Sequence, residues 1–316
     1  MRMATRWLRR PQEIWLRRAL FQIHLWLGLA LGLYVVVLSV SGSVLVYRIE
    51  LNQYVSAPRA MLREGVTPMT ADQIRDAAAR VYPGWTVTGV FEGRYTARGG
   101  RGEGRGPRRP PDPTASVDLE RGGEKKDRLF DPYTGADLGD NFTRGQSAVL
   151  WLVRLHDELL LGRLDGGWWN GALSLVFTLV VLTGCVVWWP GATRWARSLR
   201  ISTKSGWRRF NWDVHSALGI WLLLFMLMWG VSGWYLGIPE PLTALVERYS
   251  DPDGAPGERP GDIALTWLTR LHFGRWRDPT WGPWLKPVWA AVGLAPAIMF
   301  VTGTIMWWNR VVRRRL

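Results

Sequence analysis

The stretch LWLGLALGLYVVVLSVSGSVLVY, residues 25–47, contains no charged side chain. A helix rises about 1.5 Å per residue, so a run of this length can cross a hydrocarbon core of about 30 Å. Three more uncharged runs are similarly long, at residues 168–189, 217–238 and 288–308. Each run carries Trp or Tyr near its ends, as aromatic belts at membrane interfaces require. The sequence therefore predicts four transmembrane helices.

The composition agrees with a multi-span membrane protein. Of the 316 residues, 47% are hydrophobic and 22 are tryptophan, and the formal net charge is +14. Basic residues concentrate in three segments that a four-span chain places on one side of the membrane, namely 1–20, 191–211 and 310–316. By the positive-inside rule this side is cytoplasmic, and so are both termini. The charge therefore indicates topology and contact with membrane lipid, and no nucleic-acid partner is expected.

These assignments divide the chain into ten segments, with an outer domain inserted between the first two transmembrane helices. In order they are a basic cytoplasmic tail (1–20), transmembrane helix 1 (21–48), the outer domain (49–147), an outer Arg-Leu-His element (148–166), transmembrane helix 2 (167–190), a basic cytoplasmic loop (191–211), transmembrane helix 3 (212–238), an outer loop with a second Arg-Leu-His element (239–283), transmembrane helix 4 (284–309) and a cytoplasmic tail (310–316).

The predicted helices form two copies of a helix pair. HLWLG at 24–28 begins the first helix and HSALG at 215–219 begins the third, and in both the Gly of a Ser-Gly pair follows the His by 18 residues. The second and fourth helices share Thr-Gly, three residues and a Trp pair, in LTGCVVWW at 182–189 and VTGTIMWW at 301–308. Equivalent helices run in the same direction, so the repeat is parallel about an axis along the membrane normal.

All four histidines of the chain occupy equivalent positions of this repeat. His24 and His215 lie at the cytoplasmic ends of the first and third helices. His156 and His272 lie outside, each in an Arg-Leu-His tripeptide before the second and fourth helices. The repeat axis puts the two members of each pair at equal depth, so their imidazoles can face one another. For any single histidine, the alternative is a polar anchor at the membrane interface.

Two facing imidazoles suit a planar metal macrocycle with two axial ligands. Two His without Cys or paired carboxylates are a poor set for zinc or di-iron, whereas axial imidazoles are ordinary haem ligands. The single cysteine, Cys185, is expected to be a packing residue, and no Cys-x-x-Cys-His motif is present, so any haem is a noncovalent b-type haem. The sequence thus predicts two b haems, a cytoplasmic-side haem on His24 and His215 and an outer-side haem on His156 and His272.

Glycines and arginines near the histidines are further candidates for haem binding. Gly28 and Gly219 follow their histidines by four residues on the same helical face, where a macrocycle could lie against the backbone. Close helix packing is the alternative for both glycines. Four arginines flank the Arg-Leu-His elements and could pair with haem propionates, with interfacial snorkelling as the alternative. These are Arg154, Arg163, Arg270 and Arg275.

The outer segment has the pattern of a small α+β domain. Thr70 is a helix cap and Pro83-Gly84 a stop, which predicts a helix at about 70–81. The insert at 97–113 is predicted to be a flexible hairpin loop, and DPYTGADLG at 131–139 to be a pair of tight turns. Strand candidates are WTVTGVFEG (85–93), ASVDLE (115–120) and KDRLFD (126–131).

This helix, these strands and LFDPYTGADLG look like a PepSY domain. The spans with HLWLG, LHDELLLG, LTG followed by WW, HSALG and LHFGRW resemble the PepSY-associated transmembrane family of bacterial inner-membrane proteins. The resemblance implies an all-α membrane core of four transmembrane helices, in two parallel repeats of a helix pair, with one α+β PepSY-like periplasmic domain between helices 1 and 2. The haem-ligating histidines of the family carry over to His24, His156, His215 and His272.

The resemblance also implies a function. The family is similar to iron-regulated membrane proteins and includes di-haem reductases that pass electrons across the inner membrane to ferric siderophores. We therefore expect a ferric-siderophore or ferric-chelate reductase that takes electrons from a cytoplasmic donor or the quinol pool. The alternatives are a non-redox anchored module whose PepSY-like domain binds or restrains an outer partner, and an electron-relay subunit for another periplasmic enzyme.

Overall fold

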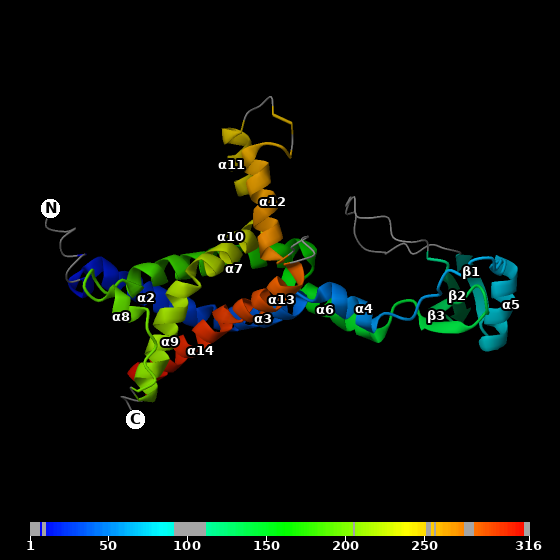
Figure 1. The fold of residues 1–316 in the computed structure, drawn as a ribbon, viewed down its shortest axis with the longest axis horizontal. Helices are drawn as coiled ribbons and strands as arrows, with labels where there is room; N and C mark the ends of the chain where they lie inside the picture. Colours follow the sequence, from blue (N-terminus) through cyan, green and yellow to red (C-terminus); the bar gives the residue numbers. More distant parts are fainter. Residues whose placement is uncertain are drawn as a thin grey trace. The chain divides into compact units, whose positions relative to one another are not determined.

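The computed structural model describes residue 7 and residues 11–91, 112–204, 206–250, 254–255, 257–274 and 281–312. Most of the predicted loop at 97–113 therefore lies outside the described residues. The chain divides into two compact units. The helical unit comprises residues 1–48 and 151–316, and the sheet unit comprises Ile49–Leu150 (Figure 1).

The described part of the helical unit is built from helices joined by short connections. Two helices, α4 (Arg48–Val55) and α6 (Arg144–Glu158), have residues in both units. The helices within the unit are η1 (Pro11–Glu13), α2 (Trp15–Ala30), α3 (Gly32–Leu45), α7 (Arg163–Trp188), α8 (Trp195–Ser198), α9 (Trp207–Trp221), α10 (Leu223–Gly237), α11 (Glu240–Tyr249), α12 (Pro260–His272), α13 (Gly282–Gly293), α14 (Ala295–Trp307) and the π-helix η2 (Trp308–Val312).

Two helices in the described residues are long and apolar enough to cross a membrane by themselves. They are α7 and the segment Trp284–Val311, which includes most of α13 and all of α14. The pairs α2 with α3 and α9 with α10 also qualify, but they bend by 63° and 64°. The described residues therefore hold between two and four candidate spans, and the four-span core stays a prediction. The bends were not predicted, although they fall at equivalent places, Leu31 and Leu222, seven residues after His24 and His215.

The two halves of the repeat exchange packing partners. Helix α7 packs against α2 of its own half and α10 of the other, while α14 packs against α9 of its own half and α3 of the other. In Figure 1, α3 runs alongside α13 and α14. Small residues make these contacts close: a Cβ on Gly230 would lie 2.4 Å from Thr178 Oγ1, and a Cβ on Gly237 would lie 2.6 Å from Gly171 Cα. Helices associate in lipid through such contacts, because apolar side chains gain little free energy when they leave lipid tails for a helix interface.

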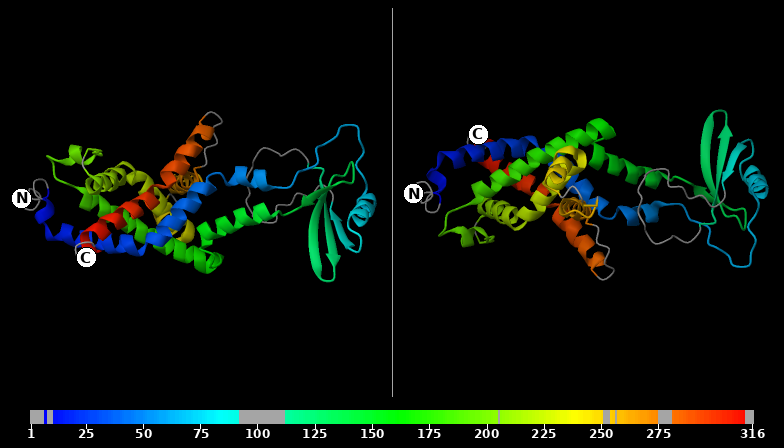
Figure 2. Two further views of the ribbon diagram at one scale, coloured as in Figure 1. Left: turned by 90° about the horizontal axis from the view of Figure 1, so that it is seen from below. Right: turned by 90° about the horizontal axis from the view of Figure 1, so that it is seen from above.

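The sheet unit is a four-stranded antiparallel sheet with one helix on it (Figure 2). The strands lie in chain order as β1 (Thr86–Phe91), β2 (Ala115–Arg121), β3 (Glu124–Phe130) and β4 (Asp137–Asp140). Helix α5 (Ala71–Val81) begins with a capping box in which Thr70 and Gln73 bond reciprocally. Ile74 and Ala78 of α5 pack on Val117 and Phe130 of the sheet, and all four are fully buried. The predicted helix and three predicted strands are confirmed.

The segment predicted as two tight turns is only partly a turn. Asp131 N–H donates to Ala136 O at 2.9 Å, and Gly135 at φ 69° closes this first turn. The remaining residues form β4 instead of a second turn, because the Asp137–Asp140 backbone pairs with β3. The prediction of a second turn was wrong, since Asp137 and Gly139, residue types favoured in turns, here lie in a strand that pairs with β3.

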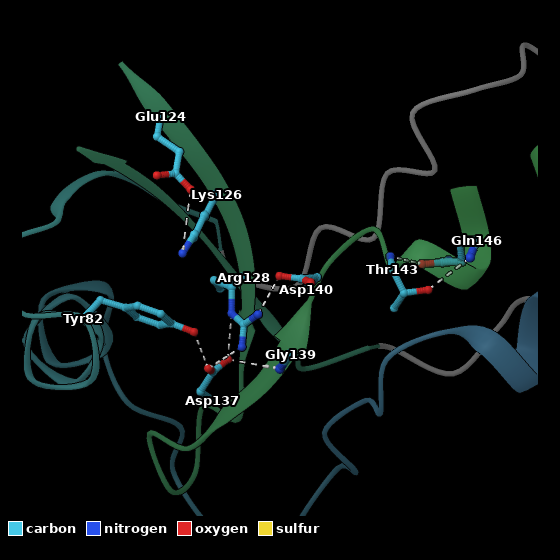
Figure 3. Close-up of polar contacts among 9 residues, drawn as sticks. All are labelled: Tyr82, Glu124, Lys126, Arg128, Asp137, Gly139, Asp140, Thr143 and Gln146. Atoms are coloured by element: carbon cyan, nitrogen blue, oxygen red, sulfur yellow. Dashed lines mark hydrogen bonds and ion pairs between the residues drawn. The ribbon is translucent and has the colours of Figure 1, made fainter. Parts of the chain in front are cut away.

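Arg128 and Asp137 join the last two strands (Figure 3). The Arg128 guanidinium donates to both carboxylate oxygens of Asp137, at 3.2 Å from Nε and 2.5 Å from Nη2. Tyr82 O–H donates to the same carboxylate at 2.5 Å. Burial alone would raise the pKa of Asp137, but the bonds from Arg128 and Tyr82 lower it below its usual value. Burial and the bond to Asp137 raise the pKa of Tyr82 to about 12.

Replacing Asp137 by Asn should lower the free energy of unfolding of the sheet unit by about 1.5–3 kcal/mol, the usual range for hydrogen bonds to a charged group. In the wild type this contribution is complete above the unfolded pKa of about 3.9 and is lost as the pH falls through the lower folded pKa. The free energies of unfolding of the wild type and the variant should therefore become equal in strong acid. Amide hydrogen exchange of β2 and β3 in the intact protein measures the difference.

The matched control is Asp140→Asn. Asp140 also accepts from Arg128, but its side chain is 55% exposed, so solvent screens the pair and we expect little change. Equal losses in the two variants would contradict the role assigned to Asp137.

Candidate functional site

The four histidines lie in two pairs within the helical unit. In the first histidine pair, His24 of α2 and His215 of α9 have ring centroids 6.4 Å apart and planes at 80°. In the second histidine pair, His156 of α6 and His272 of α12 also have centroids 6.4 Å apart, with planes at 60°. The partners in each pair are the repeat-equivalent residues. Tertiary packing thus brings together side chains that are more than a hundred residues apart in the chain.

Helix carbonyl and hydroxyl groups hold the rings of the first histidine pair. His24 Nδ1 lies 2.9 Å from Val180 O and 3.4 Å from Thr183 Oγ1, both on α7. His215 Nδ1 lies 2.9 Å from Thr302 Oγ1 on α14. Thr183 and Thr302 are the threonines of the repeated Thr-Gly motif. Each ring is therefore oriented by the second helix of its own half.

Serine hydroxyls hold the second histidine pair in the same way. Ser41 Oγ on α3 lies 2.9 Å from His156 Nδ1, and Ser232 Oγ on α10 lies 2.7 Å from His272 Nδ1. These are the serines of the repeated Ser-Gly motif. The carbonyl of His156 accepts from Asn170 Nδ2 at 2.8 Å, which ties the end of α6 to α7.

The hydroxyl groups determine which ring nitrogen carries the proton. Thr302 donates its single proton to Ile298 O at 2.8 Å, and Ser41 donates its proton to Val37 O at 2.6 Å. Ser232 Oγ lies 3.2 Å from Trp229 O and can donate to it in the same way. An oxygen whose proton is already donated accepts from the imidazole, so the neutral ring carries its proton on Nδ1. The carbonyl of Val180 imposes the same state on His24. In all four histidines the Nε2 lone pair remains available to a ligand.

Glycines beside these hydroxyls make room for the rings. A Cβ on Gly184 would lie 2.9 Å from His24 Cε1, and one on Gly303 would lie 3.2 Å from His215 Cε1. A Cβ on Gly42 would lie 2.8 Å from His156 Cε1. Sequence reasoning found these Thr-Gly and Ser-Gly motifs as repeats but gave them no role at the site. The available signals were the Ser-Gly pair that ends 18 residues after both His24 and His215, and the repeated Thr-Gly pair ahead of each Trp pair.

The two predicted glycines have different surroundings. A Cβ on Gly28 would meet no atom of the described residues within 4 Å, so the helix face one turn beyond His24 is open. A Cβ on Gly219 would lie 3.0 Å from Met299 Cε, so this glycine also permits close packing with α14. An open backbone face beside His24 is a surface on which a flat macrocycle could lie.

The predicted arginines lie at the surface. Arg154, Arg163 and Arg270 are all exposed. The Arg270 guanidinium carbon lies 5.4 Å from the centroid of the Trp267 ring, and in the described part of the chain neither Arg154 nor Arg163 forms an ion pair. Arg275 lies outside the described residues. Their predicted role with propionates stays a prediction.

The spacing of each pair fits one metal bound between two rings. Imidazole nitrogen binds a first-row metal at about 2 Å, and a ring centroid lies about 1 Å behind its nitrogen, so two axial rings have centroids about 6 Å apart. Across the described ranges, no group of three or more His, Cys, Asp and Glu side chains is placed to hold a metal. Each pair offers two nitrogen donors, which is the number of axial positions on a haem iron.

Fold and site together define a helical membrane protein with two paired-histidine sites related by an internal repeat. The PepSY-associated TM region matches residues 21–261 and 248–310, and the chain belongs to this family. A search of curated proteins finds no match to the chain.

Gly184→Ala should destabilise the protein by about 1–3 kcal/mol, because the added methyl group collides with the His24 ring that Val180 holds in place. Gly167→Ala on the same helix is the control, since a Cβ there meets no described atom within 4 Å and alanine favours the helix. Thermal unfolding in detergent compares the two variants. A thermal unfolding midpoint of Gly184→Ala equal to or higher than that of Gly167→Ala would contradict the close contact with His24.

Proposed function

We propose that the protein is a di-haem membrane electron carrier that reduces a ferric chelate outside the inner membrane. The observation that carries the proposal is the geometry of the two histidine pairs, in which both pairs have the spacing of axial ligands and every Nδ1 is held by a helix group. In this proposal His24 and His215 bind one b haem, and His156 and His272 bind the other. Haem bound in this way supplies a one-electron couple with no open position for oxygen.

The residues around each pair would orient the ligands and tune them. Hydrogen bonds from Nδ1–H to Val180, Thr302, Ser41 and Ser232 fix the tautomer, and such bonds also raise the basicity of a metal-bound imidazole. A pair of neutral rings held in place favours fast electron transfer, because the ligands need not move when the charge on the metal changes by one.

Helix length supports a path across the membrane. Ser41, which bonds His156, follows His24 by 17 residues through α2 and α3. At about 1.5 Å per residue this is about 25 Å of helix, shortened by the bend, against a hydrocarbon core of about 30 Å. The two histidine pairs would thus lie toward opposite faces. Cations on 191–211 and at both termini support assignment of the first pair to the cytoplasmic side.

The reaction would be a one-electron reduction. The donor on the cytoplasmic side, a quinol or a soluble reductant, would be oxidised. Each electron that reaches the outer side would reduce the iron of one chelate from Fe(III) to Fe(II). Hard oxygen ligands hold Fe(II) less tightly than Fe(III), so reduction favours release of the iron. The resemblance of the sequence to siderophore reductases supports this substrate class.

The purified protein should contain two b haems per chain in a pyridine haemochrome count. His156→Ala combined with His272→Ala should leave one haem, because both residues serve the same site, whereas His24→Ala with His272→Ala should leave none. Size-exclusion chromatography identifies the folded variants. Folded wild type without haem would overturn the proposal, and one haem in the second double variant would overturn the pairing.

Vesicles containing the reduced protein should convert an external, membrane-impermeant Fe(III) chelate to Fe(II), followed with an Fe(II)-specific dye. Loss of the outer haem in His156→Ala should slow this reduction at least tenfold while an internal reductant still reduces the remaining haem. A variant that keeps the wild-type rate would exclude the second histidine pair from the electron path.

A further inference from the structure

Four buried donor groups in the described residues lack a hydrogen-bond acceptor: Arg17 Nε, Trp188 Nε1, Thr304 Oγ1 and Trp307 Nε1. Their distribution is uneven, because all four belong to α2 and to the last turns of α7 and α14. These are helices that hold the first histidine pair. Trp188 and Trp307 are moreover equivalent in the repeat, since each is the first residue of its Trp pair.

Helix geometry places the two indoles beside the first histidine pair. Trp188 follows Gly184 by four residues, and Trp307 follows Gly303 by four residues. Residues four apart share a helix face and are separated by about 6 Å along the axis. Because Gly184 and Gly303 contact His24 and His215, both indoles lie about one turn beyond the imidazoles on the same faces.

Two cations lie at this level. Arg17 donates from Nη2 to Val187 O at 2.5 Å, which places the guanidinium next to Trp188, and its Nε stays without an acceptor. The Arg310 guanidinium carbon lies 5.0 Å from the centroid of the Phe21 ring, three residues before His24. The carboxylate near His215 is neutralised, because Asp213 pairs with Arg209 at 2.9 Å.

The chemistry of this set specifies its ligand. An indole N–H and a guanidinium are donors and accept nothing, and a buried donor without a partner costs about 1–3 kcal/mol. Three such donors, Arg17 Nε and the indole N–H groups of Trp188 and Trp307, lie on the helices around one site and, together with positive charge, suit an anion with several acceptor oxygens. Carboxylates on the edge of a macrocycle held between His24 and His215 would meet them.

We infer that Trp188, Trp307 and Arg17 form the binding site for the propionates of the haem on the first histidine pair. This inference rests on the proposed function and extends it, because it orients that haem with its propionates toward the ends of α7 and α14. The arginines flanking the Arg-Leu-His elements are predicted to serve the other histidine pair. The two haems would then be anchored by different chemistry, with buried indole donors at the first pair.

Trp188→Phe and Trp307→Phe test the site because each removes an N–H and keeps most of the ring. Each variant should retain two haems, lose one of them to an apo-globin acceptor about tenfold faster, and shift the propionate bending bands of that haem in resonance Raman spectra. Its reduction potential should fall, because a less neutralised carboxylate favours Fe(III). The haem on His156 and His272 is the internal control and should not change.

Trp189→Phe and Trp308→Phe are the matched control variants. Trp189 Nε1 already donates to Trp7 O at 3.1 Å, and Trp308 is 52% exposed, so neither should alter the haem spectra. The inference would be overturned if both Trp188→Phe and Trp307→Phe kept two haems, with haem spectra and rates of haem loss equal to those of the wild type. The proposed function would then remain intact. Equal effects of the control pair would also overturn the inference. Folded wild-type protein without haem would overturn both.

Discussion

The hydrogen bond at each imidazole Nδ1 is the interaction on which the site depends. An imidazole within a helical membrane unit needs a partner, and in all four cases the partner is a carbonyl or hydroxyl on a neighbouring helix. With the proton on Nδ1, the Nε2 lone pair of each ring is left for a ligand. The bond also requires a glycine beside it at Gly184, Gly303 and Gly42, since any side chain there would meet the ring. The glycines of both Thr-Gly motifs and of the first Ser-Gly motif follow from this requirement, whereas Gly233 of the second Ser-Gly motif makes room for Ser174.

The same small residues connect the two halves of the helical unit. Gly230 packs on Thr178 and Gly237 on Gly171, so α10 of the second half approaches α7 of the first closely. Ser39 Oγ on α3 donates to Gly293 O at 2.6 Å, which joins α3 to the helices of the second half. Because the halves exchange helices in this way, both histidine pairs lie between the halves. A single half would hold one imidazole of each pair and could not form either site.

The sheet unit is held together by other forces. Its core is the apolar face of α5 on the sheet, with Ile74, Val117 and Phe130 fully buried, and Arg128 with Asp137 binds the edge strand. These contacts lie within residues 49–150. The unit thus has its own hydrophobic core, whereas the helical unit depends on close packing of small residues and on satisfied polar groups.

The sequence by itself determined the features that depend on local pattern and on repetition. Apolar length predicted the membrane helices, capping and alternation predicted α5 and three strands, and the repeat predicted which histidines are equivalent. Tertiary structure decided the rest. The partners of Nδ1, the unsatisfied indoles of Trp188 and Trp307 and the bends at Leu31 and Leu222 depend on which helix faces meet. Strand β4 needed the edge of β3, and the local turn residues concealed it. The physical reason is that hydrogen-bond satisfaction and close contact are properties of pairs of surfaces, and a one-dimensional pattern specifies each surface but not its partner.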